Sequence, residues 1–258
     1  MDISTVVGFI FCYGCILLSI FMMEGSSLKT YIDLPGMIIT FGGVFAVVVV
    51  GFPLPRVLRT IKIVFQAFSD KPVNTLDTIY QLIEFSESAR RSGILSLEPQ
   101  LPEVKDPFVR AGLSLVIDGV EPALIEDILN TDIAILEDRH AKGAAVFSYM
   151  AMVAPAIGMM GTILALITVL KNLNEPSSIG PSMAVALCTT LYGVFMAYTI
   201  LNPLASKLKT KSQEEVILKK MVIKGIMSIQ AGDNPRILEQ KLMVFLPPEM
   251  RKSKYEAA

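Results

Sequence analysis

Four long apolar runs without a charged side chain are the feature that most constrains this chain. They cover approximately residues 5–23, 34–52, 144–170 and 181–204, and none of them contains Asp, Glu, Lys or Arg. A helix needs about 20 mostly apolar residues to cross a bilayer, and there it satisfies its own backbone hydrogen bonds. The pattern predicts an all-α membrane protein with four transmembrane helices.

The composition agrees with a membrane protein that also has a water-exposed part. Of the 258 residues, 52% are hydrophobic and 18% are charged, whereas soluble domains average about 25% charged. The net charge of −1 argues against a nucleic-acid-binding protein, because such proteins need a basic face. The cysteines Cys12, Cys15 and Cys188 lie in the apolar runs. Without polar partners nearby, we interpret them as buried small residues.

The distribution of basic residues predicts the orientation in the membrane. The two short segments between paired runs carry one lysine each, Lys29 and Lys171. More basic residues follow the second and fourth runs, namely Arg56, Arg59, Lys62, Lys207, Lys209 and Lys211. Because basic residues stay on the cytoplasmic side, we expect both termini in the cytoplasm.

This orientation divides the chain into two membrane hairpins and two cytoplasmic parts. We expect the hairpins at 1–52 and 144–204, a cytoplasmic helical domain at 53–143 and a cytoplasmic helical tail at 205–258. Residues 75–93 have apolar side chains at a period close to 3.6, and Gly93 is a plausible stop. Residues 118–143 run without a clear break into the third run, and 206–232 extend the fourth. A continuous helix of about 45 residues would be about 70 Å long.

The third and fourth runs combine helix-disturbing residues with hydroxyls. Proline removes a backbone hydrogen bond, and small residues let another helix approach closely. Thr162 and Thr190 can face a common interior and coordinate an ion or water by oxygen. The residues that we assign to this pathway are Pro155, Gly161, Thr162, Ala186, Thr190, Tyr192 and Pro203.

None of the four runs contains the ionisable group that ion and proton pathways usually need. Either the chain conducts nothing, or it forms the wall around a charged residue that another chain supplies.

Five stretches resemble one family closely. They are "APAIGMMGTILALITVL" (154–170), "IGPSMAVALCTTLYGVFMA" (179–197), "NPLASKL" (202–208), "SARRSGILSLE" (88–98) and "IQAGDNPRILEQKL" (229–242). By these motifs the chain is identified as a member of the MotA/PomA family, the A subunits of the bacterial flagellar stator. The resemblance covers most of the chain, including the large segment after the second run and the long tail.

The resemblance implies a homo-pentamer of A subunits around two copies of a MotB/PomB-like B subunit, in the bacterial cytoplasmic membrane. Each B chain would supply one spanning helix with an essential Asp, followed by a peptidoglycan-binding domain. Ions passing inward would bind and leave that Asp, and the A ring would turn against the rotor switch protein FliG. The implied function is conversion of ion flow into torque, with no enzymatic reaction and no cofactor.

Two charged residues outside the runs take their role from the same resemblance. Arg90 and Glu98 match the family's charged contacts with the rotor. Exposed ion pairs are individually weak, and weak pairs suit a contact that must form and release repeatedly.

Four pathway residues also match family positions. Pro155 and Pro203 match the two prolines linked to ion-driven conformational change, and Thr190 matches the hydroxyl nearest the B-subunit Asp. Thr162 matches a position where sodium-driven members tend to carry Thr and proton-driven members Ala. The resemblance therefore favours Na⁺ over H⁺ as the coupling ion.

Three alternatives stay open. A proton-driven energy-transducing scaffold of the ExbB/TolQ type is related, but its members have three spans. An integral membrane enzyme would need a metal cluster, a nucleophile–base pair or a phosphate loop, and the single histidine, His140, lies away from both hydroxyl-bearing runs. A stand-alone channel would have to coordinate ions with hydroxyls and carbonyls alone.

Overall fold

The computed structural model describes residues 3–23, 28–60 and 75–251, and these are helical with no strand among them. Parts of three predicted regions lie outside the described residues. They are 24–27 in the predicted loop, 61–74 in the predicted cytoplasmic domain, which includes Lys62, and 252–258 in the predicted tail. The chain forms two compact units. One combines Met1–Asp70 with His140–Thr210, and the other combines Lys71–Arg139 with Lys211–Ala258. The predicted all-helical fold is confirmed.

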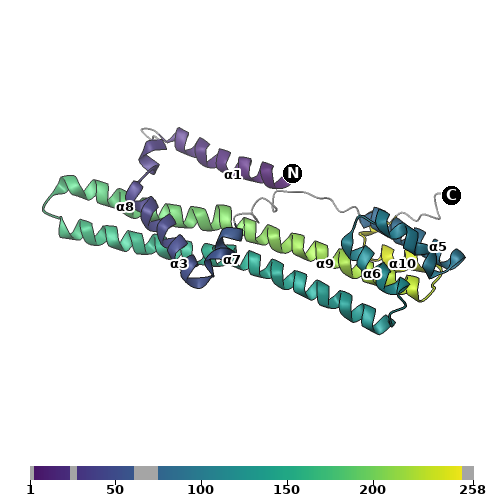
Figure 1. Ribbon diagram of the computed structural model, residues 1–258. Coiled ribbons are helices and arrows are strands. Elements are labelled where there is room, and N and C mark those ends of the chain that lie inside the picture. The colour runs from purple at the N-terminus through teal and green to yellow at the C-terminus, as the bar shows by residue number, and fades with distance from the viewer. Residues whose placement is uncertain (1–2, 24–27, 61–74, 252–258) are drawn as a thin grey trace. The chain divides into compact units, whose positions relative to one another are not determined.

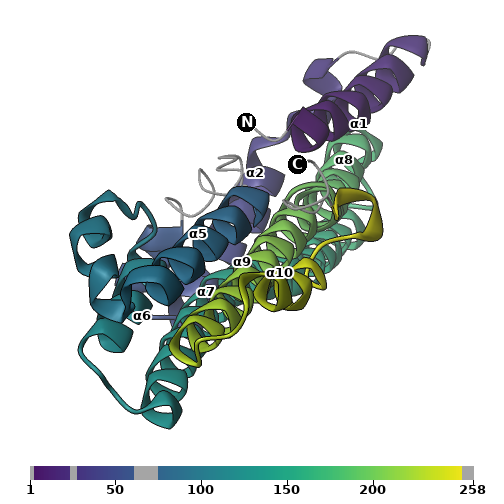
Figure 2. The same ribbon diagram turned by 90° about the vertical axis from the view of Figure 1, so that its right-hand side faces the viewer.

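The first unit contains the apolar helices. In chain order these are α1 (Ile3–Met22), η1 (Leu28–Tyr31), α2 (Leu34–Met37), η2 (Ile38–Gly42), α3 (Gly43–Gly51), the second part of α7 (Pro122–Lys171), α8 (Pro176–Phe195), η4 (Met196–Leu201) and the start of α9 (Asn202–Gln230). The last part of α7 and α8 lie side by side as a hairpin in this unit (Figures 1 and 2). A small core around Val44, Val48, Val146 and Ala154 joins α3, α7 and η4.

Three stretches of described helix are long and apolar enough to cross a membrane, Leu34–Gly51, Pro122–Lys171 and Pro176–Gln230. The helix α1 has no charged residue, but among the described residues it provides only a shorter apolar helix, Val6–Met22. The count of four transmembrane helices therefore stays a prediction. The expected continuous helix through the third run is confirmed, because α7 spans 50 residues with Pro155 inside it. The fourth helix begins at Pro176, five residues before the predicted start.

Pro203 explains an irregularity at the end of the fourth run. Proline has no N–H to donate to the carbonyl four residues earlier. Immediately before it, Met196–Leu201 widen into the π-helical segment η4. The hydroxyl of Thr199 donates to the Phe195 carbonyl at 2.6 Å within this region. Single π-helical turns of this kind accommodate a break in the α-helical ladder.

The second unit is an amphipathic helical domain. Its elements are the first part of α7, α5 (Thr75–Ser92), η3 (Ile94–Glu103), α6 (Pro107–Ile117), the second part of α9, α10 (Pro235–Met243) and η5 (Pro248–Met250). Figure 1 shows α5, α6 and α10 gathered around the end of α9. Buried aliphatic side chains such as Ile79, Leu82, Ile226 and Leu238 form its core. The predicted stop of α5 near Gly93 is confirmed.

Candidate functional site

Two helices of the first unit, α7 and α8, approach each other closely at a pair of glycines. A Cβ atom on Gly158 would lie 2.8 Å from the carbonyl oxygen of Thr189, and one on Gly193 would lie 2.5 Å from that of Ala154. Both contacts are with backbone, which a side-chain rotation cannot relieve. Two glycines facing each other therefore let the two backbones touch, as small residues do between membrane helices.

A cluster of hydroxyls lies beside this contact. The Thr162 hydroxyl, from α7, is 2.9 Å from the Ala186 carbonyl oxygen and 3.2 Å from that of Gly158. It also hydrogen-bonds the Thr190 hydroxyl and lies 3.5 Å from the hydroxyl of Thr189, both on α8. We call Thr162, Thr189, Thr190 and the Ala186 carbonyl the hydroxyl cluster. It joins the third and fourth predicted spans through neutral oxygen atoms.

Burial divides the hydroxyl cluster into an inner and an outer part. Thr189 is 0% exposed and Ala186 is 1% exposed, and the Thr189 hydroxyl donates to the Ala186 carbonyl at 2.9 Å. Thr162 and Thr190 are half-buried, so one side of each remains accessible in the single chain. Neutral hydroxyl and carbonyl oxygens are ligands for hard cations and partners for a carboxyl group.

Two residues that the sequence reasoning missed complete this region. Thr189 was not assigned to the pathway, yet it is the most deeply buried member of the cluster. Thr40, in η2, is also 0% exposed and donates to the Thr189 carbonyl at 3.4 Å. Thr40 is the only hydroxyl residue in the run 34–52, which is a signal that could have found it.

Tyr192 lies near the cluster but its hydroxyl is used elsewhere. It donates to the Tyr31 carbonyl at 2.6 Å and accepts from the Asp33 N–H at 2.8 Å. The Asp33 carboxylate in turn caps α2, accepting from the Gly36 N–H at 2.6 Å. The structure thus brings Tyr192 to the segment before α2 rather than to Thr162.

The other predicted pathway residues surround the cluster or lie away from it. Gly161 faces Thr189, whose Cγ2 atom would be 2.8 Å from an added Cβ. Pro155 is half-buried within α7, about two turns before Thr162. Pro203 is exposed at the start of α9 and lies outside the cluster.

The predicted rotor-contact residues lie in the second unit and are exposed. Arg90 is in the last turn of α5, and Glu98 is in η3, which follows directly. Arg90 borders a hollow of about 450 Å³ together with Glu87, Arg91, Asn234, Pro235 and Arg236. The hollow thus joins the end of α5 to the beginning of α10.

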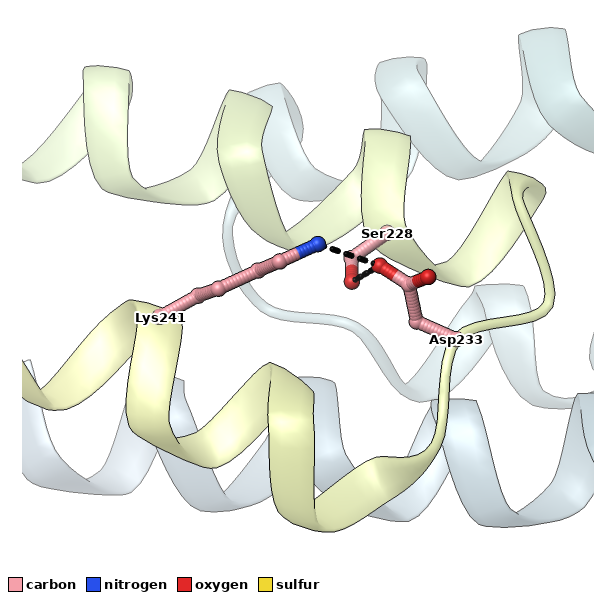
Figure 3. A network of polar contacts seen from close by, with 3 residues as sticks. All are labelled: Ser228, Asp233 and Lys241. Atoms are coloured by element: carbon pink, nitrogen blue, oxygen red, sulfur yellow. Dashed lines mark hydrogen bonds and ion pairs between the residues drawn. The ribbon is translucent and has the colours of Figure 1, made fainter.

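A polar network holds the turn before α10 (Figure 3). The Asp233 carboxylate accepts from Lys241, on α10, at 2.5 Å and from the hydroxyl of Ser228, on α9. The hydrogen bond from Lys241, followed by that from Ser228, lowers the pKa of Asp233 below its ordinary value of 3.8. Gly232 precedes it with a φ of 71°, which glycine adopts without strain. This turn fixes where α10 starts beside the hollow.

Comparisons with known proteins agree on one family. A model of the MotA/TolQ/ExbB proton channel family matches residues 100–221. The uncharacterized protein YtxD of Bacillus subtilis is 40% identical over 95% of this chain and 90% of its own length. Motility protein A of Borreliella burgdorferi is 39% identical over 97% of this chain and 96% of its own. The structure of C. jejuni MotAB matches with a TM-score of 0.91 at 28% identity, covering 98% of this chain and 100% of that one.

Proposed function

This chain belongs to the MotA/TolQ/ExbB proton channel family and is similar over nearly its full length to motility protein A. We propose that it works as the A subunit of a flagellar stator. It is an ion-coupled protein of the bacterial inner membrane that forms an oligomeric complex with a B subunit and turns ion flow into torque. The ExbB/TolQ-type alternative is disfavoured, because several relatives that match over nearly their full length are motility protein A.

The observation that carries the proposed ion pathway is the hydroxyl cluster between α7 and α8. Thr162 reaches both the Ala186 carbonyl and the Thr190 hydroxyl. The hydroxyl cluster is rich in oxygen atoms and carries no charge of its own. It can therefore hydrogen-bond a carboxyl group that the B chain supplies. One elementary charge crossing 100 mV releases about 2.3 kcal/mol, which is the work available per ion.

We propose Na⁺ as the coupling ion, because Thr162 adds an oxygen to the cluster. A sodium ion needs several oxygen ligands, whereas a proton needs only the carboxylate. Replacing Thr162 by Ala removes one oxygen and one hydrogen-bonding group. The loss of such a group typically costs about 1 kcal/mol of interaction free energy. The sodium concentration for half-maximal swimming speed should then rise about fivefold.

The experiment measures swimming speed in a stator-deleted host that expresses this chain with its cognate B chain, across sodium concentrations at constant ionic strength and pH. Thr168→Ala is the matched control, because Thr168 also lies on α7 and donates to the carbonyl four residues back, that of Leu164 at 3.2 Å, but is exposed. Speed that saturates with sodium and shifts only in Thr162→Ala supports the proposal. Speed that is indifferent to sodium but abolished by a protonophore replaces Na⁺ by H⁺ and keeps the stator function.

The orientation and the domain division remain part of the proposal. In this proposal the cytoplasm contains both termini and residues 53–143 and 205–258. Arg56 and Arg59 follow α3 and are exposed, which supports a cytoplasmic location for that end of the helix. Labelling of an engineered Arg59→Cys by an impermeant thiol reagent, in intact cells and in inverted vesicles, tests it. Labelling only in inverted vesicles is expected, and labelling in intact cells would reverse the topology.

We further propose that five copies surround two B chains and that Arg90 and Glu98 contact FliG. Both side chains are exposed on consecutive helices, which suits a transient polar contact. Reversing the charge in Arg90→Glu should reduce motility while the A–B complex still assembles and conducts. A matched opposite-charge substitution in FliG should restore motility, and unchanged motility in Arg90→Glu would exclude the contact.

A further inference from the structure

The hydroxyl of Thr40 makes a different kind of bond from other threonines in the apolar runs. A threonine within a helix can satisfy its hydroxyl on the carbonyl four residues earlier in the same helix. Thr168 and Thr199 do so, at 3.2 Å and 2.6 Å. Thr40 instead donates to the Thr189 carbonyl, on α8, at 3.4 Å. Its hydroxyl therefore links the second predicted span to the fourth.

The backbone around Thr40 is irregular without a proline to explain it. Thr40 lies in the π-helical segment η2, and it is the only buried residue of that segment. A proline follows the other π-helical segment, η4, but α3, which follows η2, contains none. Single π-helical turns occur frequently at functional sites. An extra residue in one turn changes which side chain faces the neighbouring helix, and here that side chain is Thr40.

Thr189, the residue that Thr40 reaches, is enclosed from two sides. On the side of the second predicted span, a Cβ atom on Gly36 would lie 3.2 Å from the Thr189 Cγ2 atom. On the α7 side, a Cβ on Gly158 would lie 2.8 Å from the Thr189 carbonyl oxygen, and one on Gly161 would lie 2.8 Å from Cγ2. Because close-packed groups transmit small displacements to one another, the second span and α7 together fix the position of Thr189.

The position of Thr189 in turn determines the geometry of the hydroxyl cluster. The Thr189 and Thr162 hydroxyls each lie 2.9 Å from the Ala186 carbonyl oxygen. The next residue along α8, Thr190, hydrogen-bonds the Thr162 hydroxyl. A shift of α8 at Thr189 would therefore displace several oxygen atoms of the cluster together. Cation ligands depend on outer groups that hold them in place, and the loss of such a group weakens binding.

We propose that Thr40 is a positioning residue, which fixes α8 at Thr189 and thereby sets the affinity of the hydroxyl cluster for sodium. Thr40 is fully buried, so it acts through α8 rather than as a ligand of the ion. Packing alone does not explain a threonine here, because valine would fill the same space without the cost of burying a hydroxyl. This role of Thr40 rests on the proposed function, since it requires sodium to bind at the cluster.

Swimming speed across sodium concentrations, in the stator-deleted host with the cognate B chain, tests this role. Thr40→Val keeps the shape of the side chain and removes the hydroxyl, whereas Thr40→Ser keeps the hydroxyl. We expect Thr40→Val to raise the half-maximal sodium concentration about fivefold, with the same speed at saturating sodium. Thr40→Ser should restore the wild-type value. Thr199→Val is the matched control and should not change it, because Thr199 also lies in a π-helical segment but bonds its own helix.

The thermal unfolding midpoint of the purified A–B complex separates positioning from packing. A Thr40→Val complex with a lower midpoint or a lower saturated speed, but an unchanged half-maximal sodium concentration, would overturn the positioning role. An equal shift in Thr40→Ser or in Thr199→Val would overturn it as well. If Thr40→Val does not assemble, Thr40→Ala removes the same hydroxyl and is judged by the same values.

The wild type reports separately on the proposed function. A wild-type speed that does not depend on sodium would refute sodium as the coupling ion, and the role of Thr40 in sodium affinity with it. A sodium-dependent wild type with an unshifted Thr40→Val would refute the role of Thr40 alone.

Discussion

Replacing Gly193 by Ala should force α7 and α8 apart. The new Cβ would lie 2.5 Å from the Ala154 carbonyl oxygen, and real Cβ atoms essentially never approach closer than 3.0 Å. The backbones must therefore separate locally by at least about 0.5 Å. Overpacking of this kind costs about 1–3 kcal/mol. The Thr162–Ala186 hydrogen bond, at 2.9 Å, spans the same helix pair and would lengthen, which costs about another 1 kcal/mol.

The assay is the thermal unfolding midpoint of the purified A–B complex in detergent, with swimming speed measured in parallel. Gly42→Ala is the matched control, because nothing lies within 4 Å of the Cβ that it adds. In a helix that change is neutral or stabilising by up to about 1 kcal/mol. We expect Gly193→Ala to lower both the midpoint and the speed. A Gly193→Ala complex as stable and motile as the wild type would refute the close helix contact, and equal damage from Gly42→Ala would refute the steric explanation.

Three further predictions concern two polar contacts and one glycine in a turn. Tyr192→Phe leaves the Asp33 N–H without its acceptor, so we expect faster hydrogen exchange at that amide and a loss of about 1–3 kcal/mol. Because Lys241 lowers the pKa of Asp233 in the folded state, its stabilisation is present above the unfolded value of 3.8 and is lost as the pH falls through the folded pKa. The stability difference between wild type and Asp233→Asn, measured by denaturant titration, should be constant at neutral pH and shrink below 3.8, and a constant difference throughout would contradict this assignment. Gly232→Ala places a side chain at a φ of 71° and should cost about 1–2 kcal/mol in the same titration.

The helices followed largely from hydrophobic patterning. The charge-free runs and the 3.6-residue period of 75–93 correspond to described helices, and Gly93 ends α5 as expected. Two short helices, α6 and α10, were not predicted. Both had sequence signals, because Asp106 and Asn234 cap them and a proline follows each cap. Short amphipathic helices depend on the surrounding core, which a local pattern does not contain.

The candidate site was less accessible to sequence reasoning, because it depends on how two helices cross. Thr162 and Thr190 meet in the structure, although their role in ion flow stays a prediction. Thr189 and Thr190 are adjacent in the chain, and only the position of α7 decides which hydroxyl is buried. The hydroxyl of Tyr192 bonds residues about 160 positions earlier. No periodicity within α8 indicates that contact.

The hydroxyl cluster has a consequence for how fast its surroundings can respond. Each threonine hydroxyl carries one proton, which rotates about the C–O bond, and two lone pairs. The Thr162 proton has the carbonyls of Gly158 and Ala186 and the Thr190 hydroxyl as alternative acceptors. The same heavy-atom positions can therefore turn lone pairs towards a cation or a proton towards a carboxylate. Such rotations need far less time than the microsecond-to-millisecond motions of whole helices. In the ion pathway that we propose, the hydroxyl cluster therefore reverses its local dipole as each ion arrives or leaves, before any helix has moved.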